Sequence, residues 1–302
     1  MIEAWVPITI AAAFLQNLRS AMQKALKSEL SNNGATYVRF LYGVPFAALV
    51  LGTLMFADES VSLPKPRQDF FLFGLAGGLA QIFGTAALLK AVTLRSFAVG
   101  TAYSKTEPLQ AAFFGLVLLG EGVTAPGLAG LFISGLGVIA LSVPIENLSA
   151  RRFLDFGPAA WLGLASGALF AIAAVCYRGA SLSLSPESGV FVRALFTLVA
   201  VILFQTLVMT GYLLAREPGQ LARVGRAWRP GLLVGASGAF ASMGWFTAMT
   251  LENAAHVRAV GQLELVFALL SSWLFFREKI RATELAGISA ILLGILILIG
   301  NR

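Results

Sequence analysis

The sequence is short of charge, of cysteine and of histidine. Only 12% of its 302 residues are charged, against roughly 25% in an average soluble domain. The single cysteine, Cys176, excludes an internal disulfide, and one cysteine with one histidine cannot supply a metal cluster of these residue types. Phosphate-binding lysine loops, hydrolase triads and zinc-peptidase motifs are also missing from the sequence. These absences predict that the protein is not an enzyme and that it has no cofactor and no metal.

Apolar residues dominate what is present. They make up 58% of the chain, and the mean hydropathy is +0.81. A water-soluble protein of this composition would have no polar surface, so we predict a polytopic membrane protein whose partner is the lipid bilayer. The net charge of +7 is scattered over short loops rather than gathered in a basic patch, which argues against a nucleic-acid partner.

Ten stretches have the length and apolarity of membrane-spanning helices, which need about 20 residues each. Short connections join them, and none is long enough to form a soluble domain. The predicted spans are roughly 5–23, 36–56, 70–90, 96–119, 124–144, 158–177, 188–213, 230–250, 256–276 and 283–300.

The second half of the chain repeats the first. Residues 74–142 fall on residues 231–299 without a gap when they are shifted by 157 positions, and this shift aligns Glu107 with Glu264. Duplicated membrane units are typical of secondary transporters, whose substrate site lies between the two copies. Because each half holds an odd number of spans, the second copy enters the membrane upside down relative to the first.

We therefore predict an all-α polytopic membrane protein with ten transmembrane helices in two inverted five-helix repeats. The first repeat comprises residues 1–144, a connecting loop comprises residues 145–156, and the second repeat comprises residues 157–302.

Basic residues predict an orientation. The loops after the odd-numbered spans hold 13 of the 22 basic residues, and the opposite side holds five. The positive-inside rule then places the odd loops in the cytoplasm and both termini outside.

The fourth predicted span contains a charged and kinked segment. Thr101 and Lys105 share one helical face, and Tyr103 and Glu107 share another. Pro108 removes a backbone donor and is expected to kink the helix. A charge inside a bilayer costs about 2.5–3.5 kcal/mol on insertion scales, so this segment requires a functional or structural reason.

The ninth predicted span is the repeat partner of the fourth. Arg258 and Gln262 align with Thr101 and Lys105, and Glu264 aligns with Glu107. Each repeated carboxylate has two interpretations. It either couples a proton or cation to transport or contacts the solute, or it ties helices together through Arg39 and Arg193, which are themselves repeat-related at a shift of 154.

The remaining polar candidates lie in other spans. Gln16 and Arg19 share a face of the first span and either line a cavity or reach the headgroups at the helix end. Gln81, Tyr103 and Trp245 either face a cavity or pack between helices. The full set of candidates for a substrate cavity or for coupling is Gln16, Arg19, Arg39, Gln81, Tyr103, Lys105, Glu107, Arg193, Trp245, Arg258, Gln262 and Glu264.

These motifs resemble the drug/metabolite transporter superfamily, in particular a permease with two EamA domains. The pattern is a Pro-containing apolar helix that ends in Leu119-Gly120-Glu121, followed by Leu128-Ala129-Gly130, and the second copy repeats it as Arg277-Glu278 and Leu285-Ala286-Gly287. Leu265 replaces Pro108 in the second copy, so the proline hinge is expected to be one-sided. The resemblance implies ten helices, alternating access and cytoplasmic termini, and the last point conflicts with the charge count.

The function that we expect is secondary transport of a small organic metabolite, such as an amino acid or a drug-like solute. We expect an exporter in a bacterial-type inner membrane, and the burial of Glu107 and Glu264 suggests that at least one of them exchanges a proton. The alternatives are a non-transporting membrane scaffold or a channel.

Overall fold

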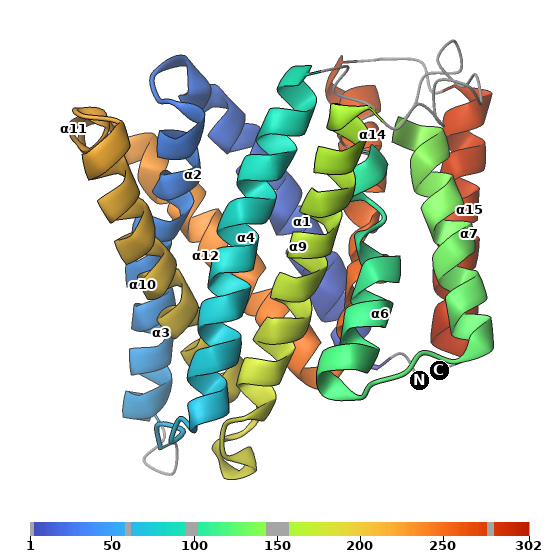
Figure 1. Ribbon diagram of the computed structural model, residues 1–302, viewed down its shortest axis with the longest axis horizontal. Helices are drawn as coiled ribbons and strands as arrows, with labels where there is room; N and C mark the ends of the chain where they lie inside the picture. Colours follow the sequence, from blue (N-terminus) through green and yellow to red (C-terminus); the bar gives the residue numbers. More distant parts are fainter. Residues whose placement is uncertain (1–2, 58–61, 95–101, 143–156, 277–280, 302) are drawn as a thin grey trace. The chain divides into compact units, whose positions relative to one another are not determined.

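The protein is entirely helical wherever its structure is described. The computed structural model describes residues 3–57, 62–94, 102–142, 157–276 and 281–301 (Figure 1). Every regular element in these ranges is a helix. The α-helices are α1 (Trp5–Ala25), α2 (Asn32–Leu41), α3 (Gly43–Ala57), α4 (Gln68–Leu94), α6 (Glu107–Leu119), α7 (Ala125–Ser142), α9 (Pro158–Leu182), α10 (Val190–Arg216), α11 (Gln220–Arg226), α12 (Trp228–Leu251), α13 (Ala254–Gly261), α14 (Leu263–Phe276) and α15 (Ala282–Gly300).

Six helical stretches of the described chain are long and apolar enough to cross a membrane. The other predicted spans correspond to α1, to the shorter apolar helix Ala125–Leu141 and to two interrupted segments at α6 and at α13–α14. The prediction of a multi-pass membrane protein is confirmed, whereas the number ten stays a prediction. The six stretches are Asn32–Ala57, Gln68–Leu94, Pro158–Leu182, Val190–Arg216, Trp228–Leu251 and Ala282–Gly300.

Large apolar side chains lie on the outside of these helices. Phe56 is 92% exposed, Leu207 is 65% exposed and Leu296 is 68% exposed. In water such side chains would form an exposed apolar surface that promotes aggregation, but in a bilayer the lipid tails cover them.

The chain divides into two compact units. Unit 1 comprises Met1–Leu79 and Cys176–Leu251, and unit 2 comprises Ala80–Val175 and Glu252–Arg302. Each unit combines a segment of the first sequence repeat with a segment of the second. Helices α4 and α9 are divided between the two units. The predicted connecting loop 145–156 lies outside the described residues.

Several residues behind the orientation prediction also lie outside the described part of the chain. Among them are Arg95, Arg151, Arg152, Arg277 and Lys279. The orientation of the termini stays a prediction.

Glycines allow close helix packing in unit 1. A Cβ on Gly244 of α12 would lie 2.8 Å from the Cβ of Ala12 on α1. A Cβ on Gly235 would lie 2.5 Å from the carbonyl of Tyr42, the residue between α2 and α3. The break at Tyr42 precedes Pro45, which has no N–H and whose ring excludes the carbonyl four residues earlier. Helix α12 therefore passes directly against this break.

A polar cluster fixes the start of α2 in unit 1. The Ser31 hydroxyl accepts a hydrogen bond from the Gly34 N–H at 3.0 Å and donates one to Glu217 Oε2 at 2.5 Å. The amide of Asn33 donates to Glu217 Oε1 at 2.6 Å. Ser31 is thus a helix N-cap that also contacts the C-terminal end of α10.

Ser31→Ala should lower the free energy of unfolding by about 1 kcal/mol, because it removes the cap of α2. The measurement is unfolding of the purified protein in mixed micelles. Asn32→Ala is the matched control, since the Asn32 side chain is exposed and forms no hydrogen bond with the described residues. Equal stability of the two variants would contradict the capping role.

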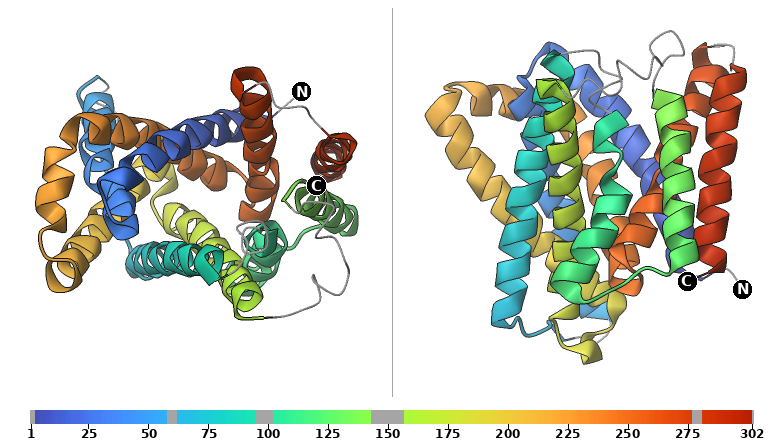
Figure 2. Two further views of the ribbon diagram at one scale, coloured as in Figure 1. Left: turned by 90° about the horizontal axis from the view of Figure 1, so that it is seen from above. Right: turned by 45° about the vertical axis from the view of Figure 1, so that its right-hand side comes forward.

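Helices α7 and α15 lie side by side in unit 2 (Figure 2). A Cβ on Gly130 would lie 2.6 Å from the Gly294 carbonyl oxygen, and a Cβ on Gly137 would lie 2.6 Å from the Gly287 carbonyl oxygen. The order of these contacts makes the pair antiparallel. The repeat shift of 157 places Gly130 on Gly287 and Gly137 on Gly294, so the two contacts are equivalent. This is the pattern that a local twofold axis between α7 and α15 produces.

Candidate functional site

Both charged segments of unit 2 are interrupted helices. Residues 102–104 are helical, Lys105 and Thr106 form a turn, and α6 begins at Glu107. In the second copy, α13 ends at Gly261 and α14 begins at Leu263. The residues at the two breaks, Lys105 and Gln262, are 157 positions apart and are therefore equivalent in the repeat.

The second break is present without a proline. The proline is found in one copy only, as predicted, but the break is found in both, so the sequence did not predict the second break. At both breaks a backbone N–H donates a hydrogen bond to the carbonyl three residues earlier. The distances are 3.2 Å from Lys105 N to Ala102 O and 3.0 Å from Gln262 N to Ala259 O. Such tight turns often end α-helices or interrupt them at functional hinges.

Gln262 holds the two breaks together. Its Nε2 donates a hydrogen bond to the Lys105 carbonyl at 3.3 Å, and its Oε1 accepts one from the hydroxyl of Ser134 on α7. Because Lys105 and Gln262 are equivalent in the repeat, this contact joins two equivalent positions. Ser134 was missed from the sequence, where its only signal is its place among the small residues of α7.

Two ion pairs connect the repeat-related segments. Arg258 Nη2 donates to Glu107 Oε2 at 2.8 Å, and Arg258 Nε lies 2.5 Å from Glu107 Oε1. Lys105 Nζ pairs with Glu264 Oε1. One interpretation of the sequence assigned Arg39 and Arg193 as partners of the carboxylates, and these two ion pairs correct it. The actual partners lie 151 and 159 residues away along the chain.

The two pairs differ in geometry and exposure. Glu107 accepts a hydrogen bond from Arg258 at Oε2 and lies within ion-pair distance of it at Oε1, and its side chain is 8% exposed. Glu264 pairs with Lys105 through Oε1, and its side chain is 19% exposed. Arg258 also lies close enough to Glu264 for their charges to attract.

The helix ends support this charge arrangement. Glu107 and Glu264 each lie in the first turn of a helix, where the helix dipole favours negative charge. Arg258 lies in the last turn of α13, where the dipole favours positive charge. The breaks therefore stabilise charges that an uninterrupted apolar helix would exclude.

A small pocket, with room for about one water molecule, lies among these residues. The four ion-pair residues line it together with Pro108, Gly261 and Gln262. Polar groups that converge on a hollow within apolar helices are typical of a solute or ion site in a membrane protein.

The other predicted candidates do not line this pocket. Tyr103 and Gln81 lie in unit 2. The backbone carbonyl of Tyr103 accepts a hydrogen bond from the Thr106 hydroxyl at 2.7 Å. The backbone carbonyl of Gln81 accepts one from the Thr85 hydroxyl at 2.8 Å. The remaining candidates belong to unit 1 and are Gln16, Arg19, Arg39, Arg193 and Trp245.

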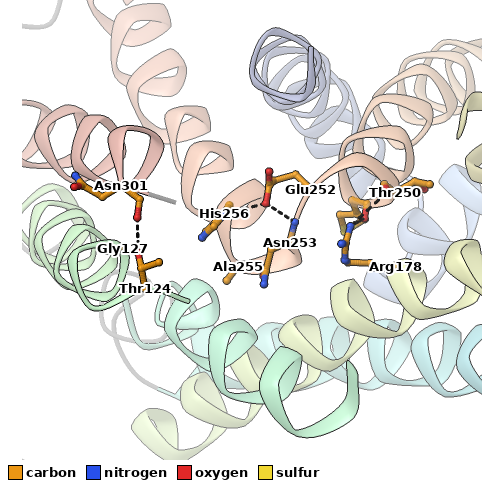
Figure 3. Close-up of polar contacts among 10 residues, drawn as sticks. Thr124, Gly127, Arg178, Thr250, Glu252, Asn253, Ala255, His256 and Asn301 are labelled. Carbon is orange, nitrogen blue, oxygen red and sulfur yellow. Dashed lines mark hydrogen bonds and ion pairs between the residues drawn. The ribbon is translucent and has the colours of Figure 1, made fainter. Parts of the chain in front are cut away.

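A second polar cluster begins α13 (Figure 3). Glu252 Oε1 lies 3.0 Å from His256 Nδ1 and accepts a bond from the Asn253 N–H at 2.8 Å. The Asn253 side chain caps the helix by accepting from the Ala255 N–H at 2.8 Å. These bonds fix the start of the helix that carries Arg258.

Another capping contact in Figure 3 lies in unit 1. Arg178 donates to the Met249 carbonyl at 2.7 Å, at the C-terminal end of α12. Within the described residues, no group of three histidine, cysteine or acidic side chains is placed to hold a metal ion.

Comparison with known proteins places the chain in a family context. The model of the EamA-like transporter family matches residues 4–143 and residues 157–300. A solved structure, described only as a crystal structure of a protein, is similar to this chain with a TM-score of 0.72 at 14% identity. The match covers 99% of this chain and 98% of the other, and it shows a shared fold. No curated protein matches the sequence significantly.

Proposed function

The chain belongs to the EamA-like transporter family of membrane transporters of small solutes, and we propose on this premise that its unit 2 pocket couples a proton to solute movement. The solute is a small organic metabolite such as an amino acid or a drug-like compound. The protein exports it across a bacterial-type inner membrane.

The observation that carries this proposal is the pair of equivalent helix breaks with oppositely charged side chains around one pocket. A break exposes backbone groups and gives the segment two conformations at low cost, as alternating access requires. The contact between the repeat-equivalent residues Lys105 and Gln262 supports a local twofold axis through the pocket. Two mirror-related states around that axis would open the site to either side of the membrane.

Glu264 is the residue that we assign to proton exchange. Its carboxylate pairs with Lys105, and its side chain is 19% exposed against 8% for Glu107, so it is the more accessible of the two to a proton. When Glu264 is protonated, Lys105 loses its counter-ion and is released into the pocket. A lysine ammonium can itself give up a proton in an apolar site, whereas an arginine stays charged.

Glu107 has a different role in this proposal. Two contacts hold it to Arg258, and its side chain is nearly buried. It keeps the permanent charge of Arg258 neutralised while the neighbouring pair opens and closes. The repeat-related carboxylates have thus diverged into one fixed ion pair and one exchangeable ion pair.

The test is transport in proteoliposomes, using a solute found by screening amino acids, nucleosides and sugars for thermal stabilisation. Glu264→Gln should reduce accumulation driven by a pH gradient to background, while exchange of labelled for unlabelled solute continues. Glu187→Gln, at an exposed carboxylate of the α9–α10 connection, should leave both activities unchanged. Accumulation by Glu264→Gln with an unchanged dependence on pH would refute the coupling role.

The same vesicles distinguish a carrier from the alternatives. Solute on the far side accelerates uptake only by a carrier, because a loaded site reorients and a pore does not. Uptake without this trans-stimulation would indicate a channel, and no uptake of any tested class would favour a scaffold.

A further inference from the structure

Unit 1 contains an arginine that has buried donor atoms and that no described residue neutralises. Arg39 lies in the last turn of α2. Its Nε and Nη2 atoms are buried and have no hydrogen-bond partner within the part of the chain that the structure describes. Its guanidinium carbon lies 4.5 Å from the centre of the Phe40 ring, which offers a weak cation–π contact but accepts no hydrogen bond.

A second cation lies beside the first. Arg19 of α1 is close enough to Arg39 for their charges to interact unfavourably. Gly238 of α12 makes room for both, since a Cβ there would lie 3.1 Å from Arg19 Cδ and 3.9 Å from Arg39 Cβ. Three helices of unit 1 therefore bring two like charges together.

The charge of Arg39 is unfavourable unless an anion completes it. A buried charge without a partner is strongly destabilising, and a neighbouring like charge adds to that cost. In unit 2, by contrast, each ion pair joins a cation to a carboxylate. The buried donors of Arg39 that have no partner among the described residues therefore indicate a site for an external anion.

We propose that Arg39, assisted by Arg19, binds an oxyanion, either a carboxylate or a phosphate, that belongs to the transported solute. The planar guanidinium presents donors in a fork that matches the spacing of oxygens in both groups. The negative end of α2 and the Phe40 ring hold the Arg39 side chain in place without satisfying its donors.

Tyr177 completes one wall of this site. It lies close enough to Arg39 for the two groups to interact electrostatically, and its ring stacks on Phe246 with 4.6 Å between centroids. Its hydroxyl donates to the Gly77 carbonyl at 3.1 Å, and Gln205 donates to the same hydroxyl at 3.3 Å. Because the hydroxyl is engaged in this way, Tyr177 positions the site while Arg39 supplies the binding donors.

Thermal unfolding of the full-length protein in a neutral detergent tests the site, with inorganic phosphate and succinate as probes and chloride at equal ionic strength as reference. Either oxyanion should raise the melting temperature by about 3–5 °C at roughly ten times its dissociation constant. Arg39→Gln should lose this shift and should melt, without the probe, no lower than the natural protein. Arg229→Gln removes an exposed arginine of the same unit and should keep the full shift.

Arg39→Lys provides a second measurement that does not depend on the folding of Arg39→Gln. It keeps the charge but loses the fork, so it should bind the probes with a clearly smaller shift. Equal shifts in Arg39→Lys, Arg39→Gln and the natural protein would overturn the proposal, as would the absence of any shift.

A third arm separates a soluble anion from a lipid headgroup. Phosphatidylglycerol added to the micelles carries the same phosphate chemistry, and stabilisation by this lipid alone would reassign the site to lipid and overturn its role in solute binding. The assignment of the anion to the solute rests on the proposed transport function, but the binding measurement does not. A failure here leaves the role of Glu264 standing, and a failure of coupling leaves the oxyanion site standing.

Discussion

Glu107→Gln is expected to lower the free energy of unfolding by about 3–5 kcal/mol, the cost of removing one partner from a buried ion pair. The substitution keeps the shape of the side chain but leaves the Arg258 guanidinium without its carboxylate partner. Arginine cannot relieve the cost by deprotonation. The measurement is unfolding of the purified protein in mixed micelles.

A double-mutant cycle shows whether the loss arises from the stranded charge. Glu107→Gln combined with Arg258→Gln should regain most of the lost stability, because the double variant buries no unpaired charge. Glu264→Gln should cost clearly less than Glu107→Gln, since Lys105 can lose its proton and is partly exposed. Equal losses in the two single variants would contradict the division between a fixed pair and an exchangeable pair.

Gly137→Ala is expected to destabilise the protein by about 1–3 kcal/mol, the usual cost of forcing a methyl group into a packed contact. The new Cβ would lie 2.6 Å from the Gly287 carbonyl oxygen and 2.8 Å from the Ile291 backbone nitrogen. Both obstacles are backbone atoms, so α7 and α15 must move apart and lose their close packing.

Gly135→Ala is the matched control on the same helix. A Cβ at this position meets no atom within 4 Å, and alanine is the better helix former, so stability should be unchanged or slightly higher. Gly294→Ala should behave like Gly137→Ala, because the two glycines are equivalent in the repeat and the new Cβ would approach the Gly130 carbonyl. A similar effect of substitution at Gly135 and Gly137 would exclude direct helix contact as the cause.

The class of the protein and the position of its pocket could be predicted from the sequence. Apolar composition is a property of whole spans, so a membrane protein follows from it without knowledge of the packing. The ungapped repeat identified Glu107 and Glu264 as equivalent. Five of the predicted candidates line the pocket, namely Lys105, Glu107, Arg258, Gln262 and Glu264.

The partners of these residues could not be predicted in the same way. Arg39 and Arg193 are plausible partners for the carboxylates because they share the repeat symmetry, whereas Arg258 and Lys105 are not equivalent to each other. Which cation meets which carboxylate depends on the rotation and depth of each helix, and helical periodicity within one segment does not contain that information. The break at Gln262 was missed for a related reason, since the side-chain contact with Ser134 that accompanies it comes from another helix.

The sequence by itself determined that the chain is a duplicated, multi-pass membrane protein with acidic residues at matching positions, because composition, length and repeat spacing are local properties. Only the tertiary structure decided that Arg258 pairs with Glu107 and Lys105 with Glu264, and that two buried donors of Arg39 have no partner among the described residues. The physical reason is that the energy of a charge in an apolar medium depends on the few atoms within a few ångströms, and helix packing chooses those atoms.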